Sequence, residues 1–382
     1  MSSTEGKPIT CIAAVAYASA QPLTVEEIVV DAPKAHEVRI KVLKTAVCHT
    51  DAYSLSGVDP EGAFPCILGH EGSGIVESVG EGVTNVKVGD HVVALYTAEC
   101  QKCKFCLSGK TNLCGSVRAT QGKGVMPDGT TRFHNKKGEP ILHFMGCSTF
   151  SQYTVVADVS LVAIDKSASL EAASLLGCGV TTGYGAAIKT ANIQKDDNVA
   201  VFGAGTVGLS VVQGAKSRGA KKIMVIDINN EKKQWSFDFG ATHFINPKEL
   251  KKGETIVSKL VEMTDGGLEY TFDCTGNTQV MRDALESCHK GWGESIIIGV
   301  AAAGAEISTK PFQLVTGRVW RGSAFGDIKG RSEMGGLIKS YQEGSLKVDE
   351  FITHRRPMSE INLAFKDLHH GDCLRTVLDP AL

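Results

Sequence analysis

Up to Val93, short runs in which apolar and polar residues alternate are separated by turns rich in Gly, Pro and Asp. Strict alternation puts one set of side chains on each face of an extended chain, so it predicts half-buried β-strands. The clearest runs are Val38 to Val42, Gly74 to Val79 and His91 to Leu95. We expect a compact, mostly β domain that presents its functional residues on loops.

Beyond Cys178 the pattern changes to short apolar runs separated by stretches with helical periodicity. Strands that alternate with helices predict a parallel, doubly wound sheet, because each helix carries the chain back across one face. The expected strands are Val199 to Phe202, Ile223 to Ile226, Gly267 to Cys274 and Ser295 to Val300.

A chain of 382 residues is long for one hydrophobic core and suits two domains. We expect a mostly β domain over residues 1–180 and a nucleotide-binding domain over residues 181–324. Residues 325–382 would return to complete the first domain, with helices at Gly335 to Tyr341 and Ser359 to Leu368. The expected fold class is therefore α/β.

Charge and cysteine usage narrow the class of protein. With 40 basic and 42 acidic side chains, the formal net charge is -2 and the basic residues are dispersed, so neither nucleic acid nor a membrane is an expected partner. Twelve cysteines, in a pattern that favours metal sites over disulfides, indicate a cytoplasmic location. The stretch Ile9 to Ala18 resembles a short signal peptide, but Glu5 precedes it and Thr10 interrupts it, so we expect a β-strand.

Four cysteines form one lobe at about residues 95–115, with the spacing Cys100-x2-Cys103-x2-Cys106-x7-Cys114. Thiolates at such intervals can wrap one tetrahedral zinc ion, and a site with no open position is structural. An iron–sulfur cluster also uses this kind of spacing, but no proline follows the last cysteine. A zinc module for nucleic acid is disfavoured by the neutral charge.

A second metal site is expected from residues that lie far apart in the sequence. Cys48 and His70 offer a thiolate and an imidazole, which are ligand types that zinc prefers. The best third ligand is Cys178, whose flanking glycines let the backbone pack closely around a metal. A catalytic zinc keeps few protein ligands, so its signal is sparse. Taken singly, Cys48 could be a small buried hydrophobe and His70 a core histidine.

A glycine motif, Gly203-x-Gly205-x-x-Gly208, stands between an expected strand and an expected helix. There the first glycine allows a tight turn, the second lets a pyrophosphate approach, and the third lets helix and strand pack. Asp227 ends the next expected strand, where a carboxylate binds ribose hydroxyls and repels a 2′-phosphate. The motif therefore favours NAD over NADP, although Asp227 alone could be a turn residue.

These motifs add up to a family resemblance. The chain matches the zinc signature of the medium-chain dehydrogenases at Gly69, His70, Glu71, Gly74, Gly80 and Val83. At Cys48 to Tyr53 and at Gln121 to Gly124 it resembles the class III alcohol dehydrogenases more narrowly, and the resemblance covers nearly the whole chain. It implies a GroES-like catalytic domain, a Rossmann cofactor domain, two zinc ions per subunit and a homodimer. It also implies that the four-cysteine lobe is remote from catalysis.

The resemblance assigns roles to five further residues. Thr50 would touch the substrate oxygen and start a proton relay, and Glu71 would lie behind the catalytic zinc. His49 and Arg375 would contact the cofactor pyrophosphate, and Lys232 the ribose. From the residues alone, Glu71 could equally be a partner of a zinc ligand, Thr50 a loop cap and Lys232 a solvated lysine.

The resemblance also implies a substrate, S-hydroxymethylglutathione, which forms from formaldehyde and glutathione and carries two carboxylates and an ammonium. The matching charged residues are Asp59, Glu61, Arg118 and Lys290. Each of them would be a surface charge when seen alone. The chain departs from the family at Tyr53, where the classical liver enzymes carry a histidine of the proton relay, and at Gly115, where a glutamine is usual.

The expected function is the NAD- and zinc-dependent oxidation of S-hydroxymethylglutathione to S-formylglutathione. Long-chain alcohols and S-nitrosoglutathione would be further substrates. A general short-chain alcohol dehydrogenase is the alternative, in which Arg118 and Asp59 would serve no purpose. A non-catalytic NAD-binding relative is disfavoured because all three expected zinc ligands are present. In a dimer, Ile296 to Val300 and Phe312 to Trp320 could extend a sheet across a two-fold axis.

Overall fold

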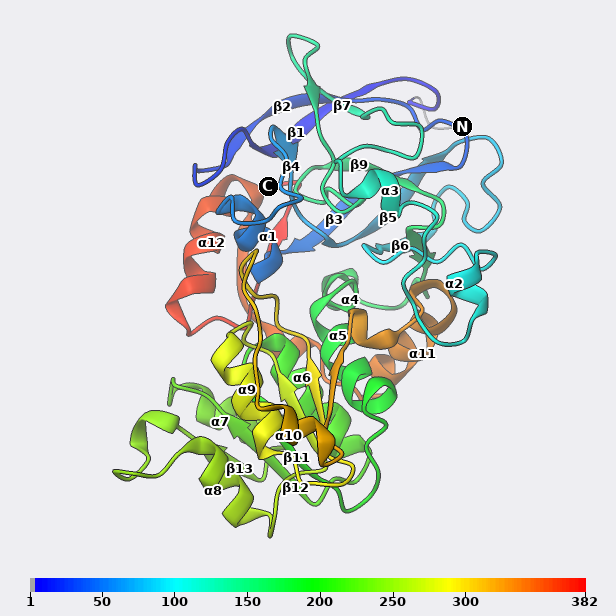
Figure 1. Cartoon of the computed structure of the whole chain (residues 1–382). Helices are drawn as coiled ribbons and strands as arrows, with labels where there is room; N and C mark the ends of the chain where they lie inside the picture. Colours follow the sequence, from blue (N-terminus) through cyan, green and yellow to red (C-terminus); the bar gives the residue numbers. More distant parts are fainter. Residues whose placement is uncertain (1–3) are drawn as a thin grey trace. The chain divides into compact units, whose positions relative to one another are not determined.

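The computed structural model describes residues 4–382 (Figure 1). The chain forms two compact units. Unit 1 comprises the residues up to Cys178 and from Lys329 onward, and unit 2 comprises Gly179–Ile328. Within residues 4–382, no helix is both long enough and apolar enough to cross a bilayer.

A five-stranded sheet in unit 1 has the strand order β4-β1-β2-β7-β8. The expected first strand is confirmed as β1, which pairs antiparallel with β2 from Ile9↔Val30 to Val15↔Thr24. The strands are β1 (Ile9–Ala16), β2 (Thr24–Val30), β4 (Cys66–Ile67), β7 (Phe133–Asn135) and β8 (Pro140–Ile141).

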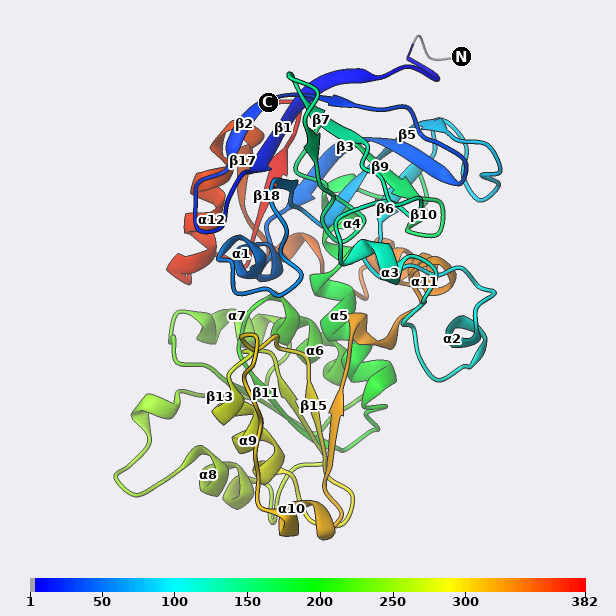
Figure 2. The same cartoon turned by 45° about the horizontal axis from the view of Figure 1, so that its top comes forward.

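A seven-stranded sheet in unit 1 has the order β10-β6-β5-β3-β18-β17, and β9 pairs with β3. The strands are β3 (Glu37–Ala46), β5 (Glu71–Val79), β6 (His91–Ala94), β9 (Tyr153–Ala157), β10 (Leu161–Ala163), β17 (Ile352–Pro357) and β18 (Arg375–Asp379). The return segment thus joins this sheet, and Figure 2 shows β18 beside β3.

The order β5-β3-β18 brings three distant points of the chain together. Glu71 and Val377 both pair with Ala46, the last residue of β3. Glu71 begins β5, Arg375 begins β18, and Cys48 follows the end of β3. Neighbouring strands lie about 5 Å apart, so these three residues meet at one end of the sheet.

Short helices surround the two sheets of unit 1. In the core, Phe365 of α12 packs in one cluster with Val15 of β1 and Ile67 of β4. The helices expected in the return segment are confirmed as α11 and α12. The α-helices are α1 (His49–Leu55), α2 (Lys104–Leu107), α3 (Arg118–Gln121), α4 (Leu170–Leu176), α11 (Gly330–Gln342) and α12 (Ile361–His370).

Unit 2 contains a six-stranded sheet, β13-β12-β11-β14-β15-β16, in which all neighbours are parallel. Counted within the unit, this order is 3-2-1-4-5-6, the order of dinucleotide-binding sheets. The expected doubly wound fold is confirmed. The strands are β11 (Asn198–Phe202), β12 (Lys222–Ile226), β13 (His243–Ile245), β14 (Tyr270–Asp273), β15 (Glu294–Ile297) and β16 (Val319–Gly322).

Two strands of unit 2 are shorter than expected. The expected strand Gly267 to Cys274 begins only at Tyr270, because Gly267 has a φ of 127°, which is not an extended conformation. The expected strand Ser295 to Val300 ends at Ile297, because the next two backbone N–H groups both donate to the Asp273 carbonyl and turn the chain.

The helices of unit 2 connect the parallel strands. They are α5 (Gly179–Gly185), which a π-helical turn (Ala186–Thr190) continues, α6 (Thr206–Ser217), α7 (Lys232–Phe239), α8 (Ile256–Met263), α9 (Thr278–Ser287) and α10 (Pro311–Val315). The glycine motif begins directly after β11, and its third glycine, Gly208, lies in the first turn of α6.

Candidate active site and metal centres

Four side chains that the sequence analysis singled out converge inside unit 1. The ligand atoms of Cys48, His70, Glu71 and Cys178 all lie within 4.8 Å of one another. All four residues are buried, and His70 Nε2 has no hydrogen-bond partner in the described part of the chain. A buried, unpartnered imidazole nitrogen beside two thiols is a donor set that fits a zinc ion.

A buried carboxylate that the sequence analysis did not single out holds these side chains in place. Asp51 accepts the backbone N–H groups of Cys48 and Gly69, each at 3.0 Å. Its Oδ1 also lies 3.1 Å from His70 Nδ1. This contact places the imidazole proton on Nδ1 and leaves Nε2 as a metal ligand. A signal was present, because Asp51 follows Cys48 by the three residues of a capping box.

Replacing Asp51 by asparagine is expected to weaken zinc binding at this cluster about 10- to 100-fold. The amide keeps the shape of the carboxylate, but it turns one acceptor into a donor that faces a backbone N–H or the His70 ring. Competition with a zinc chelator measures the affinity. Asp90→Asn is the control, because the Asp90 carboxylate accepts a turn N–H from Lys87 and lies outside the cluster. Equal zinc affinities in the two variants would contradict the role of Asp51.

Arg375 lies in the same buried cluster. Its Nε and Nη2 atoms each lie 2.9 Å from a carboxylate oxygen of Glu71, and Nη2 lies 3.5 Å from Cys48 Sγ. The structure therefore engages this guanidinium with Glu71, and its expected contact to a pyrophosphate stays a prediction. His49, the exposed first residue of α1, also stays a predicted pyrophosphate contact.

The surrounding charges change the acidity of the cluster. A hydrogen bond with Cys178, followed by the charges of Arg375 and His70, holds the pKa of the Cys48 thiol well below its usual value, although burial opposes this. Burial raises the pKa of Glu71 to about 7, against the nearby charge of Arg375. Because the thiolate is the form that binds metal, the cluster is suited to a cation.

The four cysteines of the lobe form a second cluster, whose sulfur atoms also lie within 4.8 Å of one another. Backbone N–H groups point at the sulfurs, from Cys103 to Cys100 at 3.3 Å and from Cys106 to Cys103 at 3.5 Å. The N–H groups of Cys106 and Gly115 lower the pKa of Cys103 to about 6. Four sulfur atoms this close to one another fit one tetrahedral zinc ion.

A cavity of about 480 Å³ lies within unit 1. Phe105, Leu113 and Gly115 of the cysteine lobe form part of its wall. The lobe therefore borders this cavity, and its expected distance from catalysis stays a prediction. The lobe borders the cavity because the chain runs from Cys114 directly to Arg118, so the metal cluster and the cavity wall share one segment.

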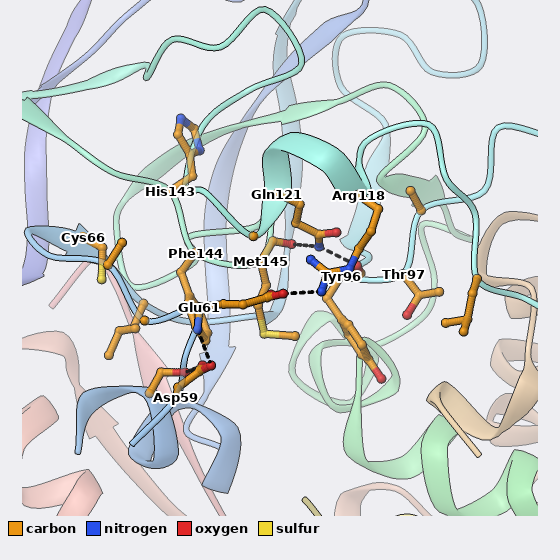
Figure 3. Close-up of a pocket in the computed structure, with 18 of the residues that line it drawn as sticks. Asp59, Glu61, Cys66, Tyr96, Thr97, Arg118, Gln121, His143, Phe144 and Met145 are labelled. Atoms are coloured by element: carbon orange, nitrogen blue, oxygen red, sulfur yellow. Dashed lines mark hydrogen bonds and ion pairs between the residues drawn. The ribbon is translucent and has the colours of Figure 1, made fainter. Parts of the chain in front are cut away.

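Charged side chains gather on one side of this cavity (Figure 3). Arg118 Nη2 lies 2.5 Å from Glu61 Oε1, and Asp59 accepts a hydrogen bond from the Ser54 hydroxyl. The structure thus brings together three of the four expected substrate contacts. Lys290 lies in unit 2, in an exposed loop before β15, and stays a prediction.

Two aromatic rings connect the cavity with the buried metal cluster. Tyr96 and Phe144 line the cavity, and their rings meet the His70 ring edge-on, with centroids 5.8 and 6.0 Å away. On the ligand side, Thr50 Oγ1 lies 3.9 Å from Cys48 Sγ. A molecule bound at the charged side can therefore extend over aromatic surface towards the metal ligands.

In the glycine motif of unit 2, glycine serves a different physical purpose at each of the three positions. Gly203 adopts a left-handed φ of 98°. A Cβ atom on Gly208 would lie 1.8 Å from the Gly203 carbonyl oxygen, so only glycine permits this packing. At Gly205, the N-cap of α6, an added Cβ would meet no atom within 4 Å. That open helix N-terminus can receive a phosphate.

Asp227 follows β12 and lies at this glycine turn. Its carboxylate accepts the backbone N–H of Ala204 at 2.8 Å and that of Asn229 at 2.9 Å. Lys232 begins α7, which follows the same loop. The structure therefore places Asp227 beside the glycines, and Lys232 at the start of the following helix.

Comparisons with known proteins agree with this arrangement. Residues 34–166 match the family model of the alcohol dehydrogenase GroES-like domain, and residues 206–343 match that of the zinc-binding dehydrogenases. A crystal structure of an alcohol dehydrogenase zinc-binding domain protein from Burkholderia ambifaria is 31% identical, with a TM-score of 0.91. The match covers 98% of this chain and 99% of that chain.

Two curated relatives are more similar in sequence. The S-(hydroxymethyl)glutathione dehydrogenase of Saccharomyces cerevisiae is 79% identical over 377 residues, which cover 98% of each chain. The alcohol dehydrogenase class-3 of Dictyostelium discoideum is 61% identical over 378 residues, which cover 99% of this chain and 100% of the relative.

Proposed function

The chain belongs to the family of S-(hydroxymethyl)glutathione dehydrogenases, or class-3 alcohol dehydrogenases, and we propose that it oxidises S-hydroxymethylglutathione to S-formylglutathione. The observation that carries this proposal is the cavity of unit 1, which is lined by Asp59, Glu61 and Arg118 and also by Tyr96 and Phe144, whose rings contact the expected zinc ligand His70. The adduct has matching parts, because its glutathione carboxylates and ammonium are charged and its hydroxymethyl group is the reacting alcohol. A small alcohol would have no charged group to match Asp59, Glu61 and Arg118.

The residues of unit 1 suit this reaction. Cys48, His70 and Cys178 would hold a zinc ion, which when bound supplies Lewis-acid activation of an alcohol. Glu71 would remain behind them, because Arg375 engages both of its oxygens. The Thr50 hydroxyl can both accept and donate a hydrogen bond, so it can accept the substrate proton while it passes its own proton on to the next acceptor. Tyr53 donates instead to the Val58 carbonyl, which leaves the outer proton step to water.

NAD is the proposed hydride acceptor, bound by unit 2. The glycines at the start of α6 would receive the pyrophosphate, with His49 and Arg375 as further contacts. Asp227 would bind the ribose hydroxyls, with Lys232 nearby, and would repel a 2′-phosphate. A second, structural zinc ion is proposed for Cys100, Cys103, Cys106 and Cys114, which would make two per chain.

Other partners follow from the same site. The aromatic side of the cavity suits long-chain alcohols, and its charged side suits S-nitrosoglutathione. All twelve cysteines are free thiols, which supports a cytoplasmic location.

A homodimer is proposed through unit 2, where β16 has only β15 as its sheet neighbour among the described strands. Exposed apolar residues, including Phe312, Val315 and Val319, lie on or near this edge.

The test is NADH formation from NAD and formaldehyde, with and without glutathione, on zinc-replete protein. Activity that requires glutathione would support the adduct as substrate. Ethanol and octanol are measured alongside. Equal or better activity with ethanol and no glutathione requirement would instead indicate a general short-chain alcohol dehydrogenase.

Replacing Arg118 by alanine is expected to raise the KM for the adduct about tenfold, with an unchanged KM for octanol. A hydrogen bond to a charged group contributes about 1.5–3 kcal/mol, and solvent weakens it here because the Arg118 side chain is 57% exposed. Steady-state kinetics check this. Lys123→Ala is the matched control, because this exposed cation lies five residues along the chain and does not line the cavity. A tenfold change with octanol as well would contradict the assignment.

A further inference from the structure

Gln121 makes two hydrogen bonds across the wall of the unit 1 cavity. Its Nε2 atom donates to the Tyr96 carbonyl at 2.7 Å and to the Met145 carbonyl at 2.6 Å (Figure 3). Both partners are acceptors, so the atom must be the amide NH2 group. One side chain therefore joins two separate loops to the helix that carries it.

That helix also carries Arg118, the cation of the charged side of the cavity. Arg118 is the first residue and Gln121 the last of the four-residue helix α3, which has no buried residue. At the N-terminal end, Val117 packs in the cluster of the cysteine lobe. At the C-terminal end, the two hydrogen bonds of Gln121 attach the helix to the rest of the cavity wall.

The two loops that Gln121 holds lead directly to the metal ligands. The Tyr96 ring meets the His70 ring, and so does the ring of Phe144, the residue before Met145. Met145 has a backbone φ of 52°, which residues other than glycine rarely adopt. Its backbone therefore needs a fixed hydrogen-bond partner. Gln121 is thus the physical connection between the arginine end and the histidine end of the cavity.

We propose that Gln121 is a positioning residue that sets the distance between Arg118 and the His70 metal site. This inference rests on the proposed function, because only a substrate that occupies both ends depends on the distance between them. An adduct of glutathione does so, whereas an uncharged alcohol has no group that pairs with Arg118. Gln121 would therefore select for alcohols that carry a distant carboxylate.

Gln121→Met and Gln121→Glu test this inference. Methionine keeps the volume without donors, and glutamate keeps the shape but sets a carboxylate against two carbonyls. We expect the KM for S-hydroxymethylglutathione to rise about tenfold in Gln121→Met and further in Gln121→Glu. In both variants, the kcat for octanol and the KM for octanol should stay within about twofold of the wild-type values. Thr120→Ala is the control on the same helix, because within residues 4–382 the Thr120 hydroxyl bonds only to the nearby Val117 carbonyl.

A double-mutant cycle with Arg118→Ala separates positioning from general support of the wall. If Gln121 acts by placing Arg118, then Gln121→Met should add less than about twofold to the KM of Arg118→Ala. A full tenfold addition, an equal loss with octanol, or wild-type kinetics in Gln121→Glu would overturn the inference. A wild-type enzyme without a glutathione requirement would refute the proposed function and this inference with it. A glutathione requirement together with equal losses on both substrates would refute the inference alone.

Discussion

Replacing Cys178 by alanine is expected to leave one zinc ion per chain instead of two and to lower NADH formation at least about a thousandfold. A bound metal contributes several kcal/mol to the activation of an alcohol, and about 4 kcal/mol corresponds to a thousandfold in rate. Cys178 is one of three expected ligands, and the fourth group of the cluster, Glu71, has both of its oxygens engaged by Arg375. Its loss should therefore remove the ion rather than only shift it.

Elemental analysis of bound zinc and single-turnover rates with octanol and with the adduct measure this effect. Cys147→Ala is the matched control, because Cys147 is a fully buried thiol of unit 1 that belongs to neither cysteine cluster. The control should keep two zinc ions and most of the activity. A Cys178→Ala protein with two zinc ions and a near-normal rate would show that the cluster has been assigned wrongly.

Replacing Cys103 by serine is expected to lower the midpoint of thermal unfolding by more than about 10 °C. Cys103 is only partly buried, so without a metal its thiol would contribute little to stability. Structural zinc contributes many kcal/mol to folding in small domains, and each kcal/mol moves the midpoint by about 2–4 °C in a domain of this size. A large shift would therefore report the loss of an ion.

Scanning calorimetry and zinc content check this second prediction. Cys11→Ser is the control, because the buried Cys11 thiol lies 3.7 Å from the Ser151 hydroxyl, a partner that a serine can keep. Since Phe105 and Leu113 line the cavity, we also expect the Cys103→Ser protein to bind the adduct more weakly. An unchanged midpoint with two bound zinc ions would contradict a structural metal in the lobe.

Local sequence patterns predicted several strands and turns of the fold. The alternation at Val38 to Val42 predicted part of β3, and the glycines from Gly203 to Gly208 predicted a turn between a strand and a helix. These predictions hold because pleating and tight turns depend on residues close in sequence. The limits of β14 and β15 were less predictable, because a glycine conformation and the Asp273 carbonyl decide them.

The sequence predicted the candidate metal ligands but not the residues that hold them and the cavity wall in position. Cys48, His70 and Cys178 were expected as ligands because of their side-chain types, and the structure brings them together. The roles of Asp51 and Gln121 were not expected. A carboxylate in a helix's first turn or an amide at a helix end has many possible partners, and only the tertiary contacts select among them.

The sequence by itself determined which groups are available to this protein: two sets of metal-binding thiols, an imidazole, a glycine turn with a carboxylate after it, and dispersed charges. The tertiary structure decided which groups act together. It pairs Arg375 with Glu71 across 304 positions of the chain, and it makes the cysteine lobe a wall of the cavity. The reason is that the order β5-β3-β18 and the loop packing around His70 depend on the burial of distant segments against one another, which no local pattern specifies.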